Sequence, residues 1–354
     1  MYFKTALKNY PNAYQLAQRV YPYFSLMMGA LRGRRGWQDH MRSTWSMLRR
    51  DTVLKGRPMN ITVEPTNLCN LYCPICETGA GILGRKEGHM TFEQFKIIFD
   101  KLGEHTNTLM FYFMGEPFLN PESYKMIRYA KDIGIPFVTT CTNGDPVNAE
   151  KLIECGLDEI NFQIGGMTQE THEIYRVNSN LERVLVALKD TIRLKRLRKS
   201  KIRILCGFIV MKHNEHEIEE FKNKMAELGV DDITIIDACV RDIEQAEKFL
   251  PKDRRYWSYD FNALAEEGVL RPKFQPINKC DWINYSLSIH VNGDVVPCCR
   301  DPKGEEVMGN LLSQDLDEVW NGDRYVAFRK KLYKDQSQIN ICRLCSSYPV
   351  SKIQ

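Results

Sequence analysis

From residue 60 onward the chain alternates short apolar runs with amphipathic stretches, and this alternation restricts the folds open to it. The strand-like runs lie at 60–63, 108–113, 136–141, 159–164, 202–210 and 232–237. Amphipathic helices are predicted between them at 91–101, 122–133, 149–155, 181–198 and 215–228. Six β-α units with short connections favour a parallel α/β sheet, either open or curled into a barrel.

The regular alternation covers only the middle of the chain. Beyond Pro251, turns rich in Gly, Pro and Asn appear together with new cysteines, so we predict a smaller module over 251–354. Before residue 58, apolar and aromatic residues recur at roughly helical spacing, which predicts a helical extension over 1–57. The domain between them is predicted over 58–250.

The N-terminal extension carries the net positive charge of the chain. Residues 1–60 hold 11 Lys or Arg and two Asp, although the whole chain has a formal net charge of +4. The extension could be a cap on the main domain or a peripheral contact with a membrane, because basic and aromatic residues lie close together there. These residues are Tyr21, Tyr23, Phe24, Arg32, Arg34, Arg35 and Trp37. A second basic run, at 193–203, ends a predicted helix, so we expect a solvated face and no nucleic-acid partner.

Twelve cysteines in 354 residues are too few for a secreted disulfide scaffold and too many for an ordinary enzyme of the cytosol. The N-terminus has no recognisable secretory signal, and its longest apolar stretch is too short to span a bilayer. We therefore expect a cytoplasmic protein, with association at a membrane surface left open. In that compartment, grouped cysteines indicate metal or redox chemistry.

Cys69, Cys73 and Cys76 form a C-x3-C-x2-C motif on a loop that follows the first predicted strand. Three thiolates this close can converge on one metal centre. Structural zinc takes four ligands, and His89, 13 residues after Cys76, is poorly placed to be the fourth. A [4Fe–4S] cluster held by three cysteines would keep one iron open for another ligand.

This motif, with Ile75 in its apolar place, resembles the signature of the radical S-adenosylmethionine (SAM) superfamily. The resemblance implies a partial (β/α)6 TIM-like barrel that binds SAM on its cluster. It also implies cofactor-binding roles in the cysteine loop and at or after the ends of later strands. The residues concerned are Ile75, Met114, Gly115, Glu116, Pro117, Thr142, Asn143, Gln163, Arg176 and Val210. Met114 stands where the family usually has glycine, and Gln163 where many relatives have serine.

The later cysteines resemble the auxiliary-cluster domain of the SPASM or shorter twitch type. This likeness implies one auxiliary [4Fe–4S] cluster, and thus two clusters in all, with Cys280, Cys298, Cys342 and Cys345 as its ligands. Cys299 could replace Cys298. Judged on spacing alone, a zinc ribbon is the plain alternative.

The resemblance implies an oxidoreductase-type enzyme that cleaves SAM reductively to a 5′-deoxyadenosyl radical, which abstracts hydrogen from a substrate. With the auxiliary cluster as electron acceptor, the preferred reaction is dehydrogenation or epimerisation of a sugar or cyclitol, with a flavodoxin- or ferredoxin-type reductant. Cys141, Cys206 and Cys239 are the candidate hydrogen donors. The alternatives are a peptide-modifying maturase, an enzyme acting on a lipid or lipid-linked substrate, and a zinc-binding interaction protein without catalytic activity.

Overall fold

The computed structural model describes residues 36–273 and 278–345. Of the predicted N-terminal extension, this range includes α3 (Trp37–Arg49) and the segment that leads from it to the first strand. Residues Tyr21, Tyr23, Phe24, Arg32, Arg34 and Arg35 lie outside the described residues.

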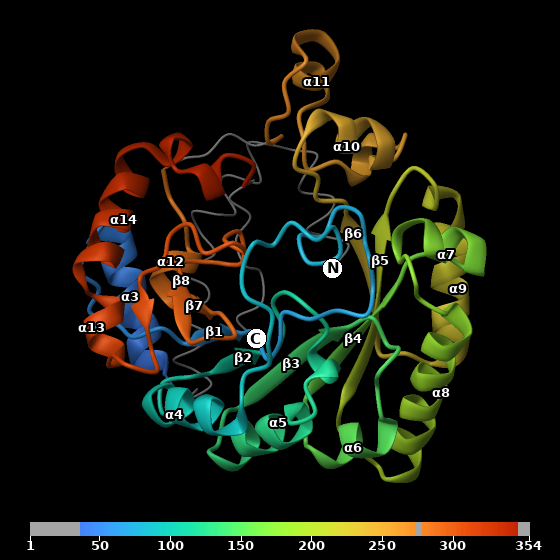
Figure 1. Ribbon diagram of the computed structural model, residues 1–354, viewed down its shortest axis with the longest axis horizontal. Coiled ribbons are helices and arrows are strands. Elements are labelled where there is room, and N and C mark those ends of the chain that lie inside the picture. Colours follow the sequence, from blue (N-terminus) through green and yellow to red (C-terminus); the bar gives the residue numbers. More distant parts are fainter. Residues whose placement is uncertain (1–35, 274–277, 346–354) are drawn as a thin grey trace.

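Six parallel strands form the centre of the molecule, and they follow chain order from one side of the sheet to the other (Figure 1). They are β1 (Asn60–Val63), β2 (Thr108–Met110), β3 (Phe137–Thr142), β4 (Glu159–Ile164), β5 (Arg203–Val210) and β6 (Asp232–Asp237). The helices that cover the outer face are α4 (Phe92–Leu102), α5 (Ser123–Asp132), α6 (Ala149–Glu154), α7 (Gln169–Tyr175), α8 (Leu181–Leu197) and α9 (Ile218–Leu228). The predicted partial TIM-like barrel is confirmed.

Capping and turn residues in the sequence set the ends of several helices and strands. Thr91 caps α4 as predicted, accepting the backbone N–H of Gln94 in a capping box. β2 ends at Met110, three residues before the predicted end, because the following chain leaves the ladder and turns at Gly115. The seven-residue helices α7 and α10 (Ile243–Phe249) were not predicted, since they are too short for a clear apolar period.

Alternation along the strands separates a helix-facing side from a barrel-facing side. On β4, Ile160, Phe162 and Ile164 belong to the main hydrophobic core. Glu159, Asn161 and Gln163 alternate with them and therefore face the barrel interior. The core thus lies between sheet and helices, and the interior is left to polar side chains.

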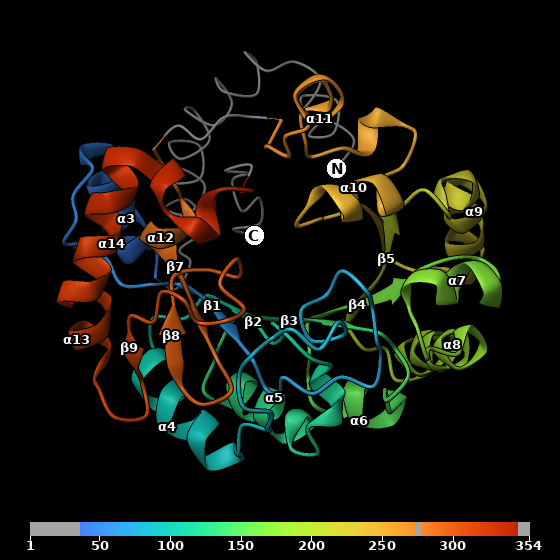
Figure 2. The ribbon, with the colours of Figure 1, turned by 45° about the horizontal axis from the view of Figure 1, so that its top comes forward.

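The C-terminal module continues the same sheet. β7 (Ser286–Ile289) pairs in parallel with β1, and β8 (Asp294–Val296) and β9 (Gly309–Asn310) follow in antiparallel order. The other elements of this part of the chain are η3 (Arg254–Tyr256), α11 (Phe261–Glu267), α12 (Trp282–Tyr285), α13 (Leu316–Trp320), α14 (Asp323–Asp335), η4 (Gln336–Gln338) and η5 (Asn340–Cys342). In Figure 2, α3, α12, α13 and α14 lie together at the β7–β9 side of the sheet, whereas α11 lies next to α10.

Candidate functional site

The three cysteines of the predicted SAM cluster lie on one loop that leaves β1 at the carboxyl end of the barrel. Cys73 is buried, and Cys69 and Cys76 pack beside it in one apolar cluster. The loop is held from β6, because Arg241 donates from Nη1 to the carbonyl oxygen of Ile75 at 2.7 Å. The same guanidinium lies 3.2 Å from a carboxylate oxygen of Glu77. Sequence patterns gave no signal for this arginine, since it lies far along the chain from the motif.

Burial raises the pKa of the Cys69 thiol to about 12, and the neighbouring Glu116 and the other two thiols add to the rise. Burial also raises the pKa of Cys73, against the opposing effect of Arg176. The three sulfurs are thus close enough to influence one another's charge. Thiols of this kind ionise readily only when a metal centre takes the place of their protons.

Within residues 36–273 and 278–345, no three His, Cys, Asp or Glu side chains meet at the spacing that a single metal ion requires. A four-iron cluster is larger than one ion and spreads its thiolate ligands further apart. Three buried sulfur donors on one loop fit such a cluster by donor chemistry.

The segment Met114–Pro117 lies directly against the cysteine loop. The Glu116 N–H donates to the Leu68 carbonyl at 2.8 Å. Gly115 has φ +74°, and a Cβ there would lie 2.5 Å from the Thr66 carbonyl oxygen. Only glycine fits this close approach. Met114 and Pro117 are buried beside it.

Glu116 is a buried carboxyl with a strongly perturbed pKa. Its exposure is 2%, and burial raises its pKa to about 7. It accepts from the Thr142 hydroxyl at 2.8 Å and from the Asn143 N–H at 2.7 Å. Asn143 in turn donates from Nδ2 to Asn70 at 2.8 Å, next to Cys69. The structure therefore brings these predicted cofactor residues together around the cysteine loop.

Arg176 and Gln163 complete this group on the other side. Arg176 Nη2 lies 3.5 Å from Gln163 Oε1, while its Nε is buried and makes no hydrogen bond within the described chain. A Cβ on Gly207 would lie 2.3 Å from Gln163 Nε2, so this glycine makes room for the glutamine. A buried guanidinium with a free donor fits a carboxylate ligand.

His172 supports the same region and was not singled out from the sequence as a site residue. Its Nδ1 accepts the Gly165 N–H at 3.1 Å, so its Nε2 carries the proton toward Ser179 Oγ, 3.0 Å away. Burial and Arg176 lower its pKa to about 4. The imidazole therefore stays neutral and fixes the loop after β4.

Two predicted cofactor residues offer no side chain to a ligand. Val210 is fully buried in the main core on the helix-facing side of β5, so only its backbone could contact SAM. Ile75 is 7% exposed and packs in the apolar cluster of the cysteine loop.

The three candidate hydrogen donors occupy different surroundings. Cys206 has no exposed surface and lies in the core between sheet and helices, away from the barrel interior. Cys141 lies on the face of β3 that is turned away from the core residue Val138. It is within electrostatic reach of Tyr112, Glu116 and Arg176. Cys239 follows β6, is exposed, and accepts a hydrogen bond from Arg300 Nη1 at 2.9 Å.

The later cysteines lie within electrostatic reach of one another. Cys280, Cys298, Cys342 and Cys345 influence one another's charge, and burial raises the pKa of each of the first three. Cys299 lies within electrostatic reach of Cys298, Cys345 and Cys239. Cys298 as the fourth ligand of an auxiliary cluster therefore stays a prediction, with Cys299 as its alternative.

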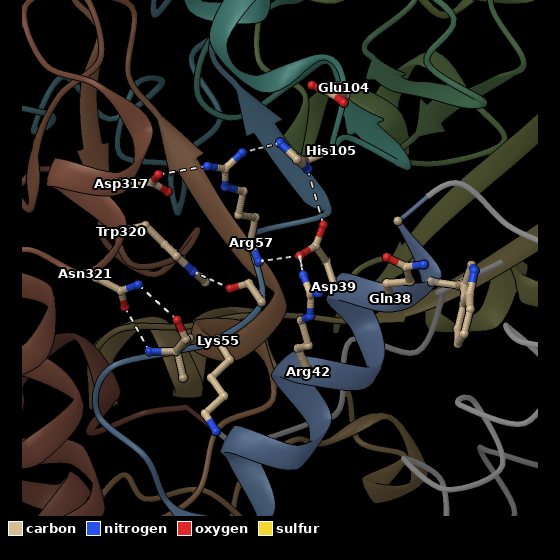
Figure 3. Close-up of a pocket in the computed structure, with 14 residues that line it drawn as sticks. Gln38, Asp39, Arg42, Lys55, Arg57, Glu104, His105, Asp317, Trp320 and Asn321 are labelled. Carbon is tan, nitrogen blue, oxygen red and sulfur yellow. Dashed lines mark hydrogen bonds and ion pairs between the residues drawn. The ribbon is translucent and has the colours of Figure 1, made fainter.

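A pocket of about 740 Å³ lies elsewhere, between α3, the entry to β1 and α13 (Figure 3). Its polar groups are largely paired with one another: Arg57 binds His105 and Asp317, and Asp39 binds His105. None of the predicted site residues lines it. Its contacts hold the N-terminal helix to both modules.

Comparisons with known proteins match both halves of the site. The radical SAM superfamily model matches residues 63–225, and the SPASM iron–sulfur cluster-binding domain matches residues 280–346. An AdoMet-dependent heme synthase of Methanosarcina barkeri is 30% identical over 181 residues, which are 50% of each chain. A probable GTP 3′,8-cyclase of Sulfurisphaera tokodaii is 26% identical over 181 residues, 50% of this chain and 55% of the relative. The chain thus spans about half the length of these curated relatives.

Solved structures agree in fold. Streptococcus suis SuiB bound to its precursor peptide SuiA aligns with a TM-score of 0.62 and 14% identity, covering 88% of this chain and 74% of that one. The structure of anSMEcpe with bound AdoMet aligns with a TM-score of 0.54 and 15% identity, covering 82% and 85%. Radical SAM domains bind SAM and a [4Fe–4S] cluster, and SPASM domains bind auxiliary iron–sulfur clusters. This chain belongs to the radical SAM superfamily and carries a C-terminal SPASM domain.

Proposed function

We propose that this enzyme dehydrogenates or epimerises a small hydroxyl-bearing molecule of the sugar or cyclitol type, with one auxiliary [4Fe–4S] cluster on Cys280, Cys298, Cys342 and Cys345. The SAM cluster is assigned to Cys69, Cys73 and Cys76. When bound, cluster and SAM together supply hydrogen-atom abstraction through a 5′-deoxyadenosyl radical. The chain's own residues hold these groups, orient the substrate and exclude water.

The polar lining of the barrel interior carries this proposal. Asn161 faces inward from β4, and its Nδ2 donates to Thr234 Oγ1 at 3.2 Å. Its Oδ1 is buried with no hydrogen-bond partner in the described chain, as are Asn60 Oδ1 and Ser288 Oγ. Buried acceptors and hydroxyls without partners suit a ligand rich in hydroxyl groups.

The barrel interior also extends toward the C-terminal module. The phenol of Tyr112, just after β2, lies within electrostatic reach of both Cys141 and Cys299. A substrate beside Tyr112 would therefore have the barrel on one side and the auxiliary module on the other. This position supports the auxiliary cluster as acceptor of the second electron in a dehydrogenation.

Of the three cysteines, Cys239 is the favoured hydrogen donor for an epimerisation. It is exposed at the end of β6, whereas Cys206 is enclosed in the core. Cys239→Ala should abolish transfer of solvent-exchangeable hydrogen to product, whereas Cys206→Ala should leave it intact. If Cys239→Ala leaves epimerisation unchanged, this role is excluded.

The main test is anaerobic incubation of the reconstituted enzyme with deuterated sugars and cyclitols. Deuterium in 5′-deoxyadenosine identifies a substrate, and the matching oxidised or inverted product identifies the reaction. Asn161→Ala should lower deuterium transfer but not iron content, while the exposed Asn262→Ala serves as control. Deuterium transfer only from labelled peptides would replace this proposal with the maturase alternative. About two zinc ions and no iron per chain would favour the zinc-binding alternative.

For the electron supply we propose a flavodoxin- or ferredoxin-type reductant that docks over the cysteine loop. Tyr72, between two cluster cysteines, is 63% exposed, and Ile82 is 44% exposed nearby in sequence. Tyr72→Glu should slow reduction by such a carrier without slowing reduction by dithionite. Equal slowing with both reductants would argue against docking at this loop.

We further propose that α3 contacts an anionic lipid surface. In the described chain, no helix is both long and apolar enough to cross a membrane. α3 instead turns Met41, Trp45 and Leu48 outward, at 46%, 57% and 39% exposure, while Ser43, Thr44 and Ser46 face inward. Arg42 and Arg49 flank this outward face with highly exposed side chains. Aromatic and aliphatic residues beside cations are typical of an interfacial helix.

Co-sedimentation with phosphatidylserine and phosphatidylcholine vesicles tests the lipid contact. Trp45→Ser with Leu48→Ser should reduce binding to the anionic vesicles. The control is Leu197→Ser, which removes a 70% exposed leucine from a basic stretch of α8. Equal vesicle binding by the α3 variant and the control would exclude a lipid contact at α3. If the original protein is a stable dimer in solution and the α3 variant is a monomer, the exposed face of α3 is instead covered by a second copy of the chain.

A further inference from the structure

The interior of the C-terminal module contains a tyrosine hydroxyl that has no hydrogen-bond partner in the described chain. Tyr325, on α14, has no exposed surface, and its Oη makes no hydrogen bond. A buried hydroxyl without a partner destabilises a fold, so such groups are rare in native proteins unless they serve a ligand. The position therefore calls for an acceptor that the polypeptide itself does not supply.

The candidate acceptors for this hydroxyl are the sulfur atoms of the cysteines assigned to the auxiliary cluster. The ionisation of Tyr325 is influenced by Cys298 and Cys280, which come from the β8 hairpin and from the start of α12. The ring is fixed, because it packs edge-on against Trp320 with centroids 4.9 Å apart. The ring is thus held in the core cluster against which Cys280 and Cys298 also pack.

A buried cation lies behind this tyrosine. Arg329, one helical turn later and fully buried, places its guanidinium 4.3 Å from the Tyr325 ring centroid and 4.5 Å from that of Trp320. Its Nη1 donates to the Trp320 and Thr52 carbonyl oxygens. Its Nε and Nη2 make no hydrogen bond to any described residue. The module therefore holds a buried positive charge against the Tyr325 and Trp320 rings.

We propose that the Tyr325 hydroxyl donates a hydrogen bond to the sulfur of the auxiliary cluster and, with the Arg329 charge behind it, raises that cluster's reduction potential. Hydrogen bonds to cluster sulfur and nearby positive charge both favour the reduced, more negative form. This inference rests on the proposed auxiliary cluster. Within that function it makes Tyr325 and Arg329 positioning and tuning residues for an electron acceptor.

Tyr325→Phe is the direct test, because it removes only an oxygen atom that has no partner in the polypeptide. The matched control is Tyr333→Phe: this phenol also lies near Cys280, but it donates to Asn284 Oδ1 at 3.1 Å. Both potentials of the holoenzyme are measured by redox titration followed by electron paramagnetic resonance, with SAM added to distinguish the SAM-binding cluster.

Tyr325→Phe should shift the auxiliary potential to a more negative value and leave the SAM-cluster potential unchanged, whereas Tyr333→Phe should shift the auxiliary potential less. The cluster-free Tyr325→Phe protein should be at least as stable as the original, since its hydroxyl forms no bond there. An unchanged auxiliary potential in a Tyr325→Phe protein that retains both clusters overturns the inference. Absence of a second cluster from the unmodified enzyme overturns the proposed function instead.

Arg329→Lys provides a second, independent measurement. It keeps the charge while it removes the planar stacking on both rings, so the potential should move less than in Arg329→Met. Equal potentials in both folded variants and the original enzyme would exclude a contribution from this charge.

Discussion

Arg300 Nη1 lies 2.9 Å from the sulfur of Cys239, and this contact joins the residue after Cys298–Cys299 to the end of β6. It places an exposed thiol where the barrel meets the SPASM domain. We expect iodoacetamide to modify Cys239 in the folded protein, because its sulfur is accessible, and to leave Cys206 unmodified until unfolding. Peptide mass spectrometry of native and denatured samples checks the order. Early modification of Cys206 would contradict the assignment of its side chain to the core.

The hydrogen bond from Arg241 to the Ile75 carbonyl oxygen predicts that Arg241 helps the protein to retain the SAM cluster. Arg241→Gln should lose iron faster to a chelator, because the loop then lacks the bond to the Ile75 carbonyl and the ion pair with Glu77. The exposed Arg255→Gln breaks a surface pair with Asp253 and should behave like the original enzyme. Equal rates of iron loss from the two variants would show that the Arg241 contacts are not needed to retain the cluster.

The proposed ligand set predicts different effects of Cys298 and Cys299 on iron content. Cys298→Ala should lose about four iron atoms per chain, because it removes a cluster ligand. Cys299→Ala should retain them, since the proposed ligand set of Cys280, Cys298, Cys342 and Cys345 does not include it. Iron and sulfide analysis of anaerobically purified protein distinguishes the two, and the reverse result would make Cys299 the ligand.

Glu116 predicts a pH dependence of SAM binding. Burial raises its pKa to about 7, so at pH 6 the empty site mainly holds the neutral acid. The ammonium group of SAM favours the carboxylate, so affinity should rise with pH, by at most ~10-fold per pH unit below that pKa, and level off above it. Glu116→Gln should bind weakly and without this slope. Titrations of SAM binding from pH 6 to 8 provide the measurement; a slope retained in the variant would assign it to another group.

The buried His172 predicts that the stability of the protein also rises with pH. Its pKa is lowered to about 4, whereas an unfolded histidine takes up a proton near pH 6.5. The unfolded state therefore binds more protons between these values, and the free energy of unfolding should fall as pH falls from 6.5 to 4. His172→Gln should lose ~1–3 kcal/mol at pH 7 and show a weaker decline. The exposed His216→Gln is the control in denaturant titrations.

The sequence predicted most of the barrel because its signals are local. Strands β1, β4 and β6 match their predicted ranges, since each is a short apolar run between turn residues. The face of β5 could not be predicted, because Leu205, Cys206, Ile209 and Val210 make both sides apolar. Val210, implied by the resemblance as a cofactor residue, and Cys206, a candidate hydrogen donor, both lie in the core.

The interactions that the sequence did not reveal join distant parts of the chain. Arg241 and Ile75 are 166 positions apart, and no periodic pattern links them. The position of Tyr325 beside Cys280 and Cys298 depends on how α14 packs against the strands, which residue spacing does not encode. Spacing does suffice to bring Cys69, Cys73 and Cys76 together on one loop, since they lie within eight residues of one another.

The parallel pairing of β1 with β7 has a consequence for folding. β1 is complete early in the chain, but one of its two neighbours arrives more than 220 residues later, with Ser286 beside Asn60. Until then, one side of β1 is an unsatisfied sheet edge that can recruit strands from other chains. Truncation before residue 280 should leave that edge permanently open and produce aggregates instead of a free-standing barrel. Because β7 completes the sheet at β1, we expect the barrel and the C-terminal module of the full chain to fold as one cooperative unit.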